Sequence, residues 1–139
     1  MNYLDRSHYF RGLLLLIGKD GHIAEKEREL LLRIGKTLDF ESSFCQETID
    51  NLLRNKYVDY EPPIFSDIEL ARTFIREGVR VSVIDNLLHV FEYEWLQSIA
   101  VANNLESWFA REFNNLLQLN KDKFDTVTEI EKYFSRKVA

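Results

Sequence analysis

The sequence predicts an all-α protein: a compact bundle of about seven helices, built from two similar three-helix units with a pseudo-twofold relation. Three observations lead to this prediction. Apolar residues recur at helical spacing, the chain holds only two prolines and five glycines, and a series of short segments is repeated in order in the second half. So few turn-forming residues leave little room for an all-β fold.

Helical periodicity is visible along most of the chain. The clearest apolar faces comprise Leu30, Leu31, Ile34 and Leu38 in one segment and Leu70, Phe74, Val81 and Ile84 in another. We expect helices near residues 5–18, 24–38, 43–55, 66–84, 92–104, 107–120 and 127–136. Capping-box spacing supports three of the starts, with the pairs Ser43 and Gln46, Ser66 and Glu69, and Thr126 and Glu129.

Three pairs of similar segments indicate an internal duplication. HIAEKE at 22–27 returns as HVFEYE at 89–94, an offset of 67 (89 minus 22) that also pairs Ile34 with Val101 and Leu38 with Leu105. ESSFCQE at 41–47 matches ESWFARE at 106–112 at an offset of 65, and NLLRNK at 51–56 resembles NLLQLNK at 115–121. Because the order is kept, we predict repeat units at about residues 5–56 and 66–121 within a single domain, 1–139.

The stretch YVDYEPPIF, residues 57–65, joins the two predicted units. Pro62 and Pro63 disfavour a helix there. We expect the aromatic residues of this stretch to pack across the seam between the units.

Composition excludes several classes of protein. A chain of 139 residues with 45% hydrophobic and 29% charged residues can bury a core and is typical of a soluble globular protein. The net charge of −5, with both signs interleaved, argues against a nucleic-acid binder. The single cysteine, Cys45, excludes an internal disulfide. No signal peptide is visible, and the longest apolar run, Leu13 to Ile17, is too short to span a membrane, so we expect a cytoplasmic protein.

The segment IGKDGHIAEKE places acidic residues around an expected helix start. Gly21 suits the left-handed conformation at a helix C-terminus, and Glu25, Glu27 and Glu29 fall in the first turns of the next helix, where the helix dipole favours carboxylates. Glu27 would also fill the third position of a capping box that begins at Ala24, although alanine has no side-chain oxygen to complete it.

Two metal sites are alternatives to helix capping. Asp20 and Glu27 could supply oxygen ligands for Ca²⁺ or Mg²⁺, although their spacing is too short for an EF-hand loop. Alternatively, two His and Glu pairs at i, i+3 spacing could converge on one transition metal and form a metalloenzyme. These pairs are His22 with Glu25 and His89 with Glu92, the reverse order of the Glu-x-x-His motif of di-iron bundles.

The remaining candidate residues are predicted to be structural. Cys45 has no acid–base partner nearby in the sequence and is expected to be a buried thiol. The aromatic residues Trp95, Trp108, Phe109 and Phe113 recur at helical spacing and are expected in the core. His8 is expected to be partly exposed on a helix. The chain contains no glycine-rich phosphate loop and no zinc cysteine set, so composition and spacing alone do not name its activity.

The run LLLLIGKDGHIAEKERELLLRIGKTLDF resembles the core signature of the TerB family, an all-helical domain associated with tellurite resistance. In that family a helix ends in a small residue followed by Asp-Gly, an aliphatic residue comes two positions later, and a Glu opens the next helix. Asp20, Gly21, Ile23 and Glu27 fill these places here, and Leu38 falls at the leucine of the family's "LG". The resemblance extends over about residues 5–120.

The resemblance implies a non-enzymatic, stress-associated seven-helix domain with an acidic patch for a divalent cation. Asp20 and Glu27 carry over directly, and Glu94 matches Glu27 at the offset of 67. The second Asp-Gly is missing, because Asp85 is followed by Asn86 and residue 87 is leucine. The implied metal ligands are therefore Asp20, Glu27, Asp85 and Glu94, with the second half-site reshaped.

A protein-interaction module is the main alternative function. Helical pairs with exposed apolar surface can dock a partner protein, and 13% aromatic residues would serve such contacts. A contiguous exposed apolar patch favours this function. An acidic concavity without such a patch favours the cation site.

Overall fold

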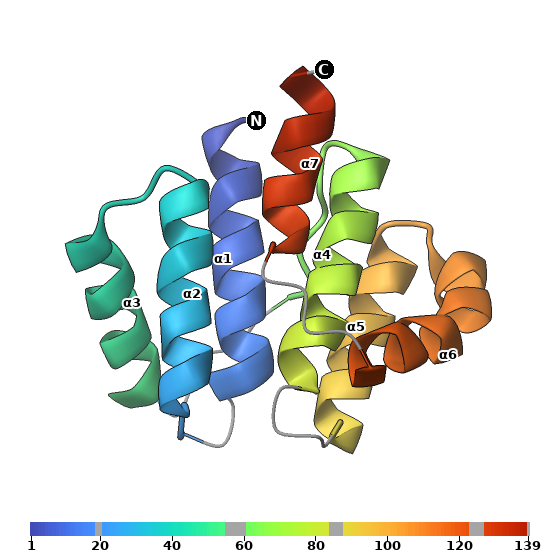
Figure 1. The fold of residues 1–139 in the computed structure, drawn as a ribbon, viewed down its shortest axis with the longest axis horizontal. Coiled ribbons are helices and arrows are strands. Elements are labelled where there is room, and N and C mark those ends of the chain that lie inside the picture. The colour runs from blue at the N-terminus through green and yellow to red at the C-terminus, as the bar shows by residue number, and fades with distance from the viewer. Residues whose placement is uncertain (19–20, 55–60, 84–87, 123–126, 139) are drawn as a thin grey trace. The chain divides into compact units, whose positions relative to one another are not determined.

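The computed structural model describes residues 1–18, 21–54, 61–83, 88–122 and 127–138, and every regular element in these ranges is a helix (Figure 1). The described residues form seven helices: α1 (Tyr3–Gly18), α2 (Glu25–Thr37), α3 (Ser42–Arg54), α4 (Ile68–Ser82), α5 (Val90–Ala102), α6 (Glu106–Asp122) and α7 (Glu129–Val138). The prediction of an all-α fold with about seven helices is confirmed.

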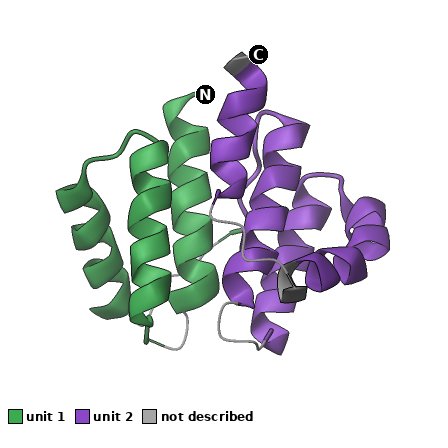
Figure 2. Ribbon diagram, viewed as in Figure 1, with its two compact units in different colours: residues 1–61 green, residues 62–139 purple. Residues whose placement is uncertain are grey.

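The chain divides into two compact units, Met1–Glu61 with α1 to α3 and Pro62–Ala139 with α4 to α7 (Figure 2). The boundary falls within the stretch 57–65 that was predicted to join the two repeats. Residues 57–60 lie outside the described ranges. Phe65 packs on Phe74 of its own unit, with ring centroids 5.4 Å apart. The pseudo-twofold relation between the units stays a prediction.

In the first unit, α1, α2 and α3 all pack against one another. The helices approach closely where Gly35 of α2 meets α3, because a Cβ atom at this position would lie 2.4 Å from the Cys45 sulfur and 3.2 Å from the Phe10 ring. The predicted apolar face of α2 is buried at Leu31 and Ile34.

In the second unit, α4 contacts each of α5, α6 and α7. Its central position explains why most of its residues are buried. The predicted face is buried at Leu70, Phe74 and Val81, whereas Ile84 lies outside the described residues.

A buried asparagine ties the segment before α4 to the end of α5. The Asn103 side chain accepts a hydrogen bond from Phe65 N (2.9 Å) and donates to Pro63 O (2.9 Å) and Ile99 O (2.8 Å). Asn103 is the C-cap of α5 and only 6% exposed, so these bonds satisfy its polar atoms away from water.

The helix ends give the predicted duplication a different register from the sequence match. The N-caps of α2 and α5 are Ala24 and His89, an offset of 65 (89 minus 24). The turns after them keep this offset, with Asp39 and Asn104 in the left-handed region at φ 69° and 59°. The predicted offset of 67 is therefore two residues out of register.

Burial shows the same register. Ile34 is fully buried and so is Ile99, its partner at 65, whereas Val101, its partner at 67, is 49% exposed. The following helices, α3 and α6, begin at Ser42 and Glu106, an offset of 64. The turn before α3 is thus one residue longer than the turn before α6.

The predicted capping boxes differ from those in the structure. The N-cap of α4 is Asp67, not Ser66, and its side chain accepts from Glu69 N at 3.3 Å. Before α7, Thr128 Oγ1 accepts from Glu131 N at 3.2 Å, two residues beyond the predicted pair at Thr126 and Glu129. Thr126 lies outside the described residues. Several residues near each start can cap, and packing selects among them.

Candidate functional site

The first acidic loop follows α1. Gly21 has the left-handed conformation expected of it, at φ 82°, and its N–H donates to Gly18 O at 3.0 Å. Glu27 Oε1 accepts a hydrogen bond from Ala24 N at 2.9 Å, the reciprocal half of a capping box. Helix capping thus uses one oxygen of the predicted metal ligand Glu27. Its predicted co-ligand, Asp20, lies outside the described residues.

The second acidic loop precedes α5, and the capping residue there is Glu92. Its Oε1 accepts from His89 N at 2.9 Å, and the residue is 7% exposed. The equivalent of Glu27 is therefore Glu92, and Glu94 is an exposed residue on the next part of α5. Asp85 lies outside the described residues. The sequence match paired Glu27 with Glu94 because it aligned identical residue types, not equivalent helix starts.

The alternative metalloenzyme residues belong to two different units, His22 and Glu25 to the first and His89 and Glu92 to the second. Within the part of the chain that the structure describes, no group of three or more His, Cys, Asp or Glu is placed to hold a metal ion.

The predicted structural residues follow expectation only in part. Cys45 is fully buried, and desolvation raises the pKa of its thiol, so it stays protonated. Trp95 and Phe109 are buried, and Phe113 is half-buried with its ring centroid 4.9 Å from that of Tyr93. Trp108 is likewise half-buried, and it lies beneath two arginines rather than within the core.

An exposed aromatic cluster lies at one end of the first unit; we define it as Tyr3, Phe40 and Phe44. The ring of Phe40 lies 6.1 Å from that of Tyr3 and 5.2 Å from that of Phe44, centroid to centroid. Tyr3 is 63% exposed and Phe44 is 40% exposed. Phe40 also contacts the buried Phe10, with centroids 6.0 Å apart, so the cluster is seated on the core.

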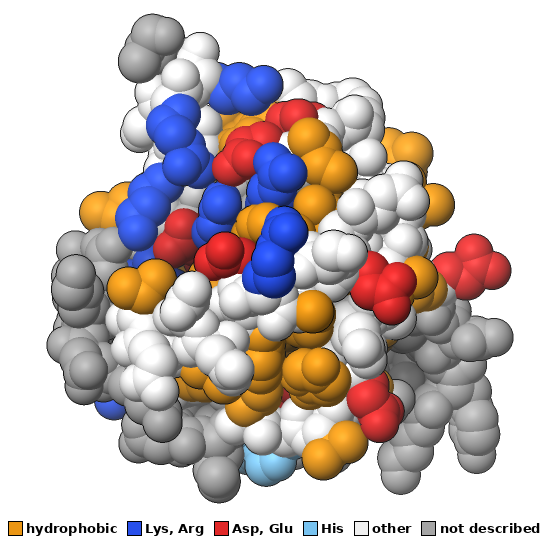
Figure 3. All heavy atoms as spheres, turned by 90° about the vertical axis from the view of Figure 1, so that its right-hand side faces the viewer, with side chains coloured by type: hydrophobic (Ala, Val, Ile, Leu, Met, Phe, Trp, Pro, Cys, Tyr) orange, Lys and Arg blue, Asp and Glu red, His pale blue; other side chains and the backbone are white. Residues whose placement is uncertain are grey.

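A second surface, built on α4 and α7, is rich in cations. We define this basic surface by Arg72, Arg76 and Arg80 of α4 and Lys132, Arg136 and Lys137 of α7. Figure 3 shows Lys and Arg side chains gathered in the upper part of the view, with acidic and apolar side chains among them. The sequence showed the spacing of the three arginines, but only folding brings the cations of α7 beside them.

Three carboxylates lie among these cations, and each has at least two cationic or hydrogen-bonding partners. Glu69 bonds Arg72 at 3.2 Å and Arg76 at 3.1 Å. Glu129 pairs with Arg80 at 3.7 Å and Lys132 at 3.4 Å. Asp67 accepts from the Tyr133 hydroxyl at 2.7 Å and pairs with Lys137 at 3.6 Å. The Tyr133 bond is the main cause that holds the pKa of Asp67 below its usual value.

A buried carboxylate holds α7 against α4. Glu77 is fully buried, and its two oxygens accept from Glu129 N at 3.1 Å and Ile130 N at 3.2 Å. Desolvation raises the pKa of Glu77 to about 7, against the lowering effect of the two backbone donors. Arg80 strengthens the same junction by donating to Val127 O. Sequence reasoning missed Glu77 because its partners lie about 50 residues further along the chain.

None of the described helices is both long enough and apolar enough to cross a membrane. Comparison with protein-family models, with curated proteins and with solved structures found no match for the chain.

Proposed function

We propose that this chain is a non-enzymatic, TerB-like helical domain whose function is to bind a partner protein, and that the aromatic cluster of the first unit is its contact surface. The observation that carries the proposal is the exposure of Tyr3 and Phe44 on either side of Phe40. Three aromatic rings in contact form a patch rather than scattered surface residues.

Physical chemistry favours a protein partner for such a patch. Aromatic residues are enriched at protein interfaces, and their large rigid rings contribute much of the binding energy there. Covering the exposed parts of Tyr3 and Phe44 would contribute on the order of 1–2 kcal/mol each. Because Phe40 is anchored on Phe10, little conformational freedom is lost when a partner binds.

The cation site and the stress-associated role implied by the resemblance stay predictions. Glu27 already caps α2 through one oxygen, and this role accounts for a carboxylate at that position without a metal ion. The exposed aromatic patch, by contrast, has no structural role that requires its exposure. This difference is the reason for preferring the protein-binding function.

The test compares two double variants of the full chain. Tyr3→Ser with Phe44→Ser removes the aromatic cluster, and Val90→Ser with Val101→Ser removes two exposed apolar residues of α5 as a control. Affinity capture with quantitative mass spectrometry identifies partners that the wild-type chain retains. Each candidate is then purified, and hydrogen exchange of the complex reports which amides it protects.

We expect the cluster variant to capture less of the partner than the wild-type chain does, by a factor of about five or more. The control variant should capture as much as the wild type. Protection should appear at residues 1–4 and 40–44. If the partner is a second copy of the chain, sedimentation will show a dimer that the cluster variant loses. Equal retention by both variants, or protection elsewhere only, would refute the proposal.

A further inference from the structure

We propose that the basic surface on α4 and α7 is a second binding surface, which takes an acidic, partly apolar peptide segment of a partner protein. It lies entirely within the second unit and uses none of the residues of the aromatic cluster. The two proposals therefore stand on separate observations and fail separately.

The first argument is charge. Six cations of α4 and α7 lie among three carboxylates, a local surplus of three positive charges in a chain whose net charge is −5. The other carboxylates of the two helices do not offset it. Glu77 is buried under the start of α7, and Glu131 lies two residues from Glu129 and so projects from a different side of the helix. A local surplus of this kind attracts an anionic partner.

The second argument is that two arginines are already held in place. The guanidinium carbons of Arg72 and Arg76 lie 5.9 and 5.5 Å from the centre of the Trp108 ring, and each side chain also donates to Glu69. Each arginine uses only one of its terminal nitrogens for Glu69 among the described residues, and the other terminal nitrogen is left as a donor. Arginines fixed in this way keep donors for a carboxylate and lose little rotamer freedom on binding.

The third argument is the apolar residue beside the arginines. Ile68 is 45% exposed and lies one helical turn before Arg72, so Ile68, Arg72 and Arg76 follow one side of α4. A partner that places an apolar side chain on Ile68 and carboxylates along the arginines would match this order. Such a pattern is typical of an acidic amphipathic segment.

Nucleic acid fits the surface less well than a peptide does. Bases stack on open aromatic faces, but Arg72 and Arg76 already lie over the ring of Trp108. The carboxylates of Glu69 and Glu129 also lie within the surface, where they would repel a continuous phosphate backbone. A peptide can place its carboxylates only where the cations are.

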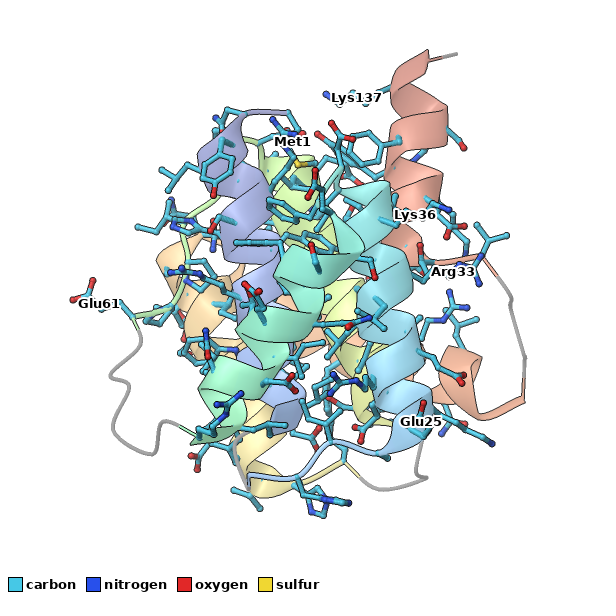
Figure 4. All side chains as sticks on the ribbon, turned by 90° about the vertical axis from the view of Figure 1, so that its left-hand side faces the viewer. Met1, Glu25, Arg33, Lys36, Glu61 and Lys137 are labelled. Carbon is cyan, nitrogen blue, oxygen red and sulfur yellow. The ribbon has the colours of Figure 1, made fainter. Side chains whose placement is uncertain are left out.

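The experiment measures binding of defined probes to the full chain. The main probe is a twelve-residue peptide with glutamates and a leucine at every fourth position, and its control has glutamine in place of each glutamate. Arg76→Gln with Arg136→Gln and Lys137→Gln removes three charges from the basic surface. Lys26→Gln with Arg33→Gln and Lys36→Gln removes three from the exposed side of α2, where Figure 4 shows Arg33 and Lys36.

We expect the acidic peptide to bind the wild-type chain and the α2 variant with equal affinity, and to bind the basic-surface variant about tenfold or more weakly. Binding should weaken with added salt, and the glutamine peptide should not bind. Three results would overturn the inference: no binding of the acidic peptide at low salt, equal weakening by both triple variants, or tighter binding of a twelve-nucleotide single strand than of the peptide.

Because the aromatic cluster is intact in both triple variants, these results are independent of the partner proposed above. Circular dichroism of each variant confirms that the fold is kept. Arg136 is exposed and Lys137 is 60% exposed at its side chain, so neither replacement disturbs the core.

Discussion

Replacing Glu77 with glutamine should remove a large part of the pH dependence of folding. In the folded chain Glu77 is buried and its pKa is raised from 4.5 to about 7, chiefly by desolvation. The folded state therefore binds this proton more tightly than the unfolded state does. The contribution of Glu77 to the free energy of unfolding is complete below about pH 4.5 and is lost as the pH rises through 7.

The magnitude follows from the shift. Each pKa unit corresponds to about 1.4 kcal/mol, so the rise from 4.5 to about 7 changes the free energy of unfolding by about 3 kcal/mol in total. Between about pH 5 and about pH 8 the wild-type chain should lose on the order of 2–3 kcal/mol through this group alone. Glu77→Gln cannot ionise, and its amide oxygen can still accept one of the two bonds from α7.

Urea unfolding followed by circular dichroism, at about pH 5 and about pH 8, gives the free energy of unfolding for each chain. The quantity of interest is the difference between wild type and Glu77→Gln, because all other titrating groups cancel in it. Glu94→Gln, an exposed carboxylate on α5, is the control and should follow the wild type. If the difference between wild type and Glu77→Gln changes by less than about 0.5 kcal/mol, the reasoning about Glu77 is wrong.

Three further predictions concern other parts of the chain. Asn103→Leu should lower the free energy of unfolding by about 2–3 kcal/mol in urea titration, because the buried Phe65 N–H loses its acceptor. Gly35→Ala should destabilise the fold by about 1–3 kcal/mol, because its Cβ would overlap the Cys45 sulfur 2.4 Å away. Adding Cys45→Ala should recover part of that loss. If the destabilisations of the two substitutions simply add, the packing argument is wrong. The implied cation site predicts that millimolar Ca²⁺ shifts the NMR resonances of Glu27, and unchanged spectra would leave this residue as a helix cap only.

The helices themselves could be predicted because burial repeats at helical spacing. Leu31 and Ile34 of α2 and Leu70 and Phe74 of α4 are buried as their spacing required. Helix starts were less accurate, because Ser66 and Asp67 are both able to cap and only the packed structure selects Asp67. The sequence therefore predicts which segments are helical better than it predicts where they begin.

The register of the repeat shows why identical letters can mislead. Glutamates near helix starts are exposed or bonded to backbone. Their position in the sequence can therefore differ by a residue or two between the units, whereas the position of a buried residue cannot. Aligning Ile34 with Ile99, both fully buried, gives the offset that the helix caps also have. An alignment weighted toward core positions would have placed Glu27 opposite Glu92 from the start.

The candidate surfaces could be predicted only in part. Arginines at four-residue intervals on α4 are visible in the sequence, but their position over Trp108 depends on the packing of α6 on α4. A buried carboxylate such as Glu77 looks the same in sequence as one on a solvated helix face. Its role depends on backbone donors at the start of α7, which are distant in the chain.

The hydrogen bonds of Asn103 have a consequence for dividing the chain into fragments. The equivalent residue in the first unit is Leu38, which is buried and apolar. Its side chain needs no hydrogen-bond partner from another segment. Asn103, in contrast, needs Pro63 and Phe65 as partners. A fragment for studying the second unit by itself must therefore begin at or before Pro62. One that begins at α4 would leave an amide buried with unmet hydrogen bonds and an exposed face where Phe65 had packed on Phe74.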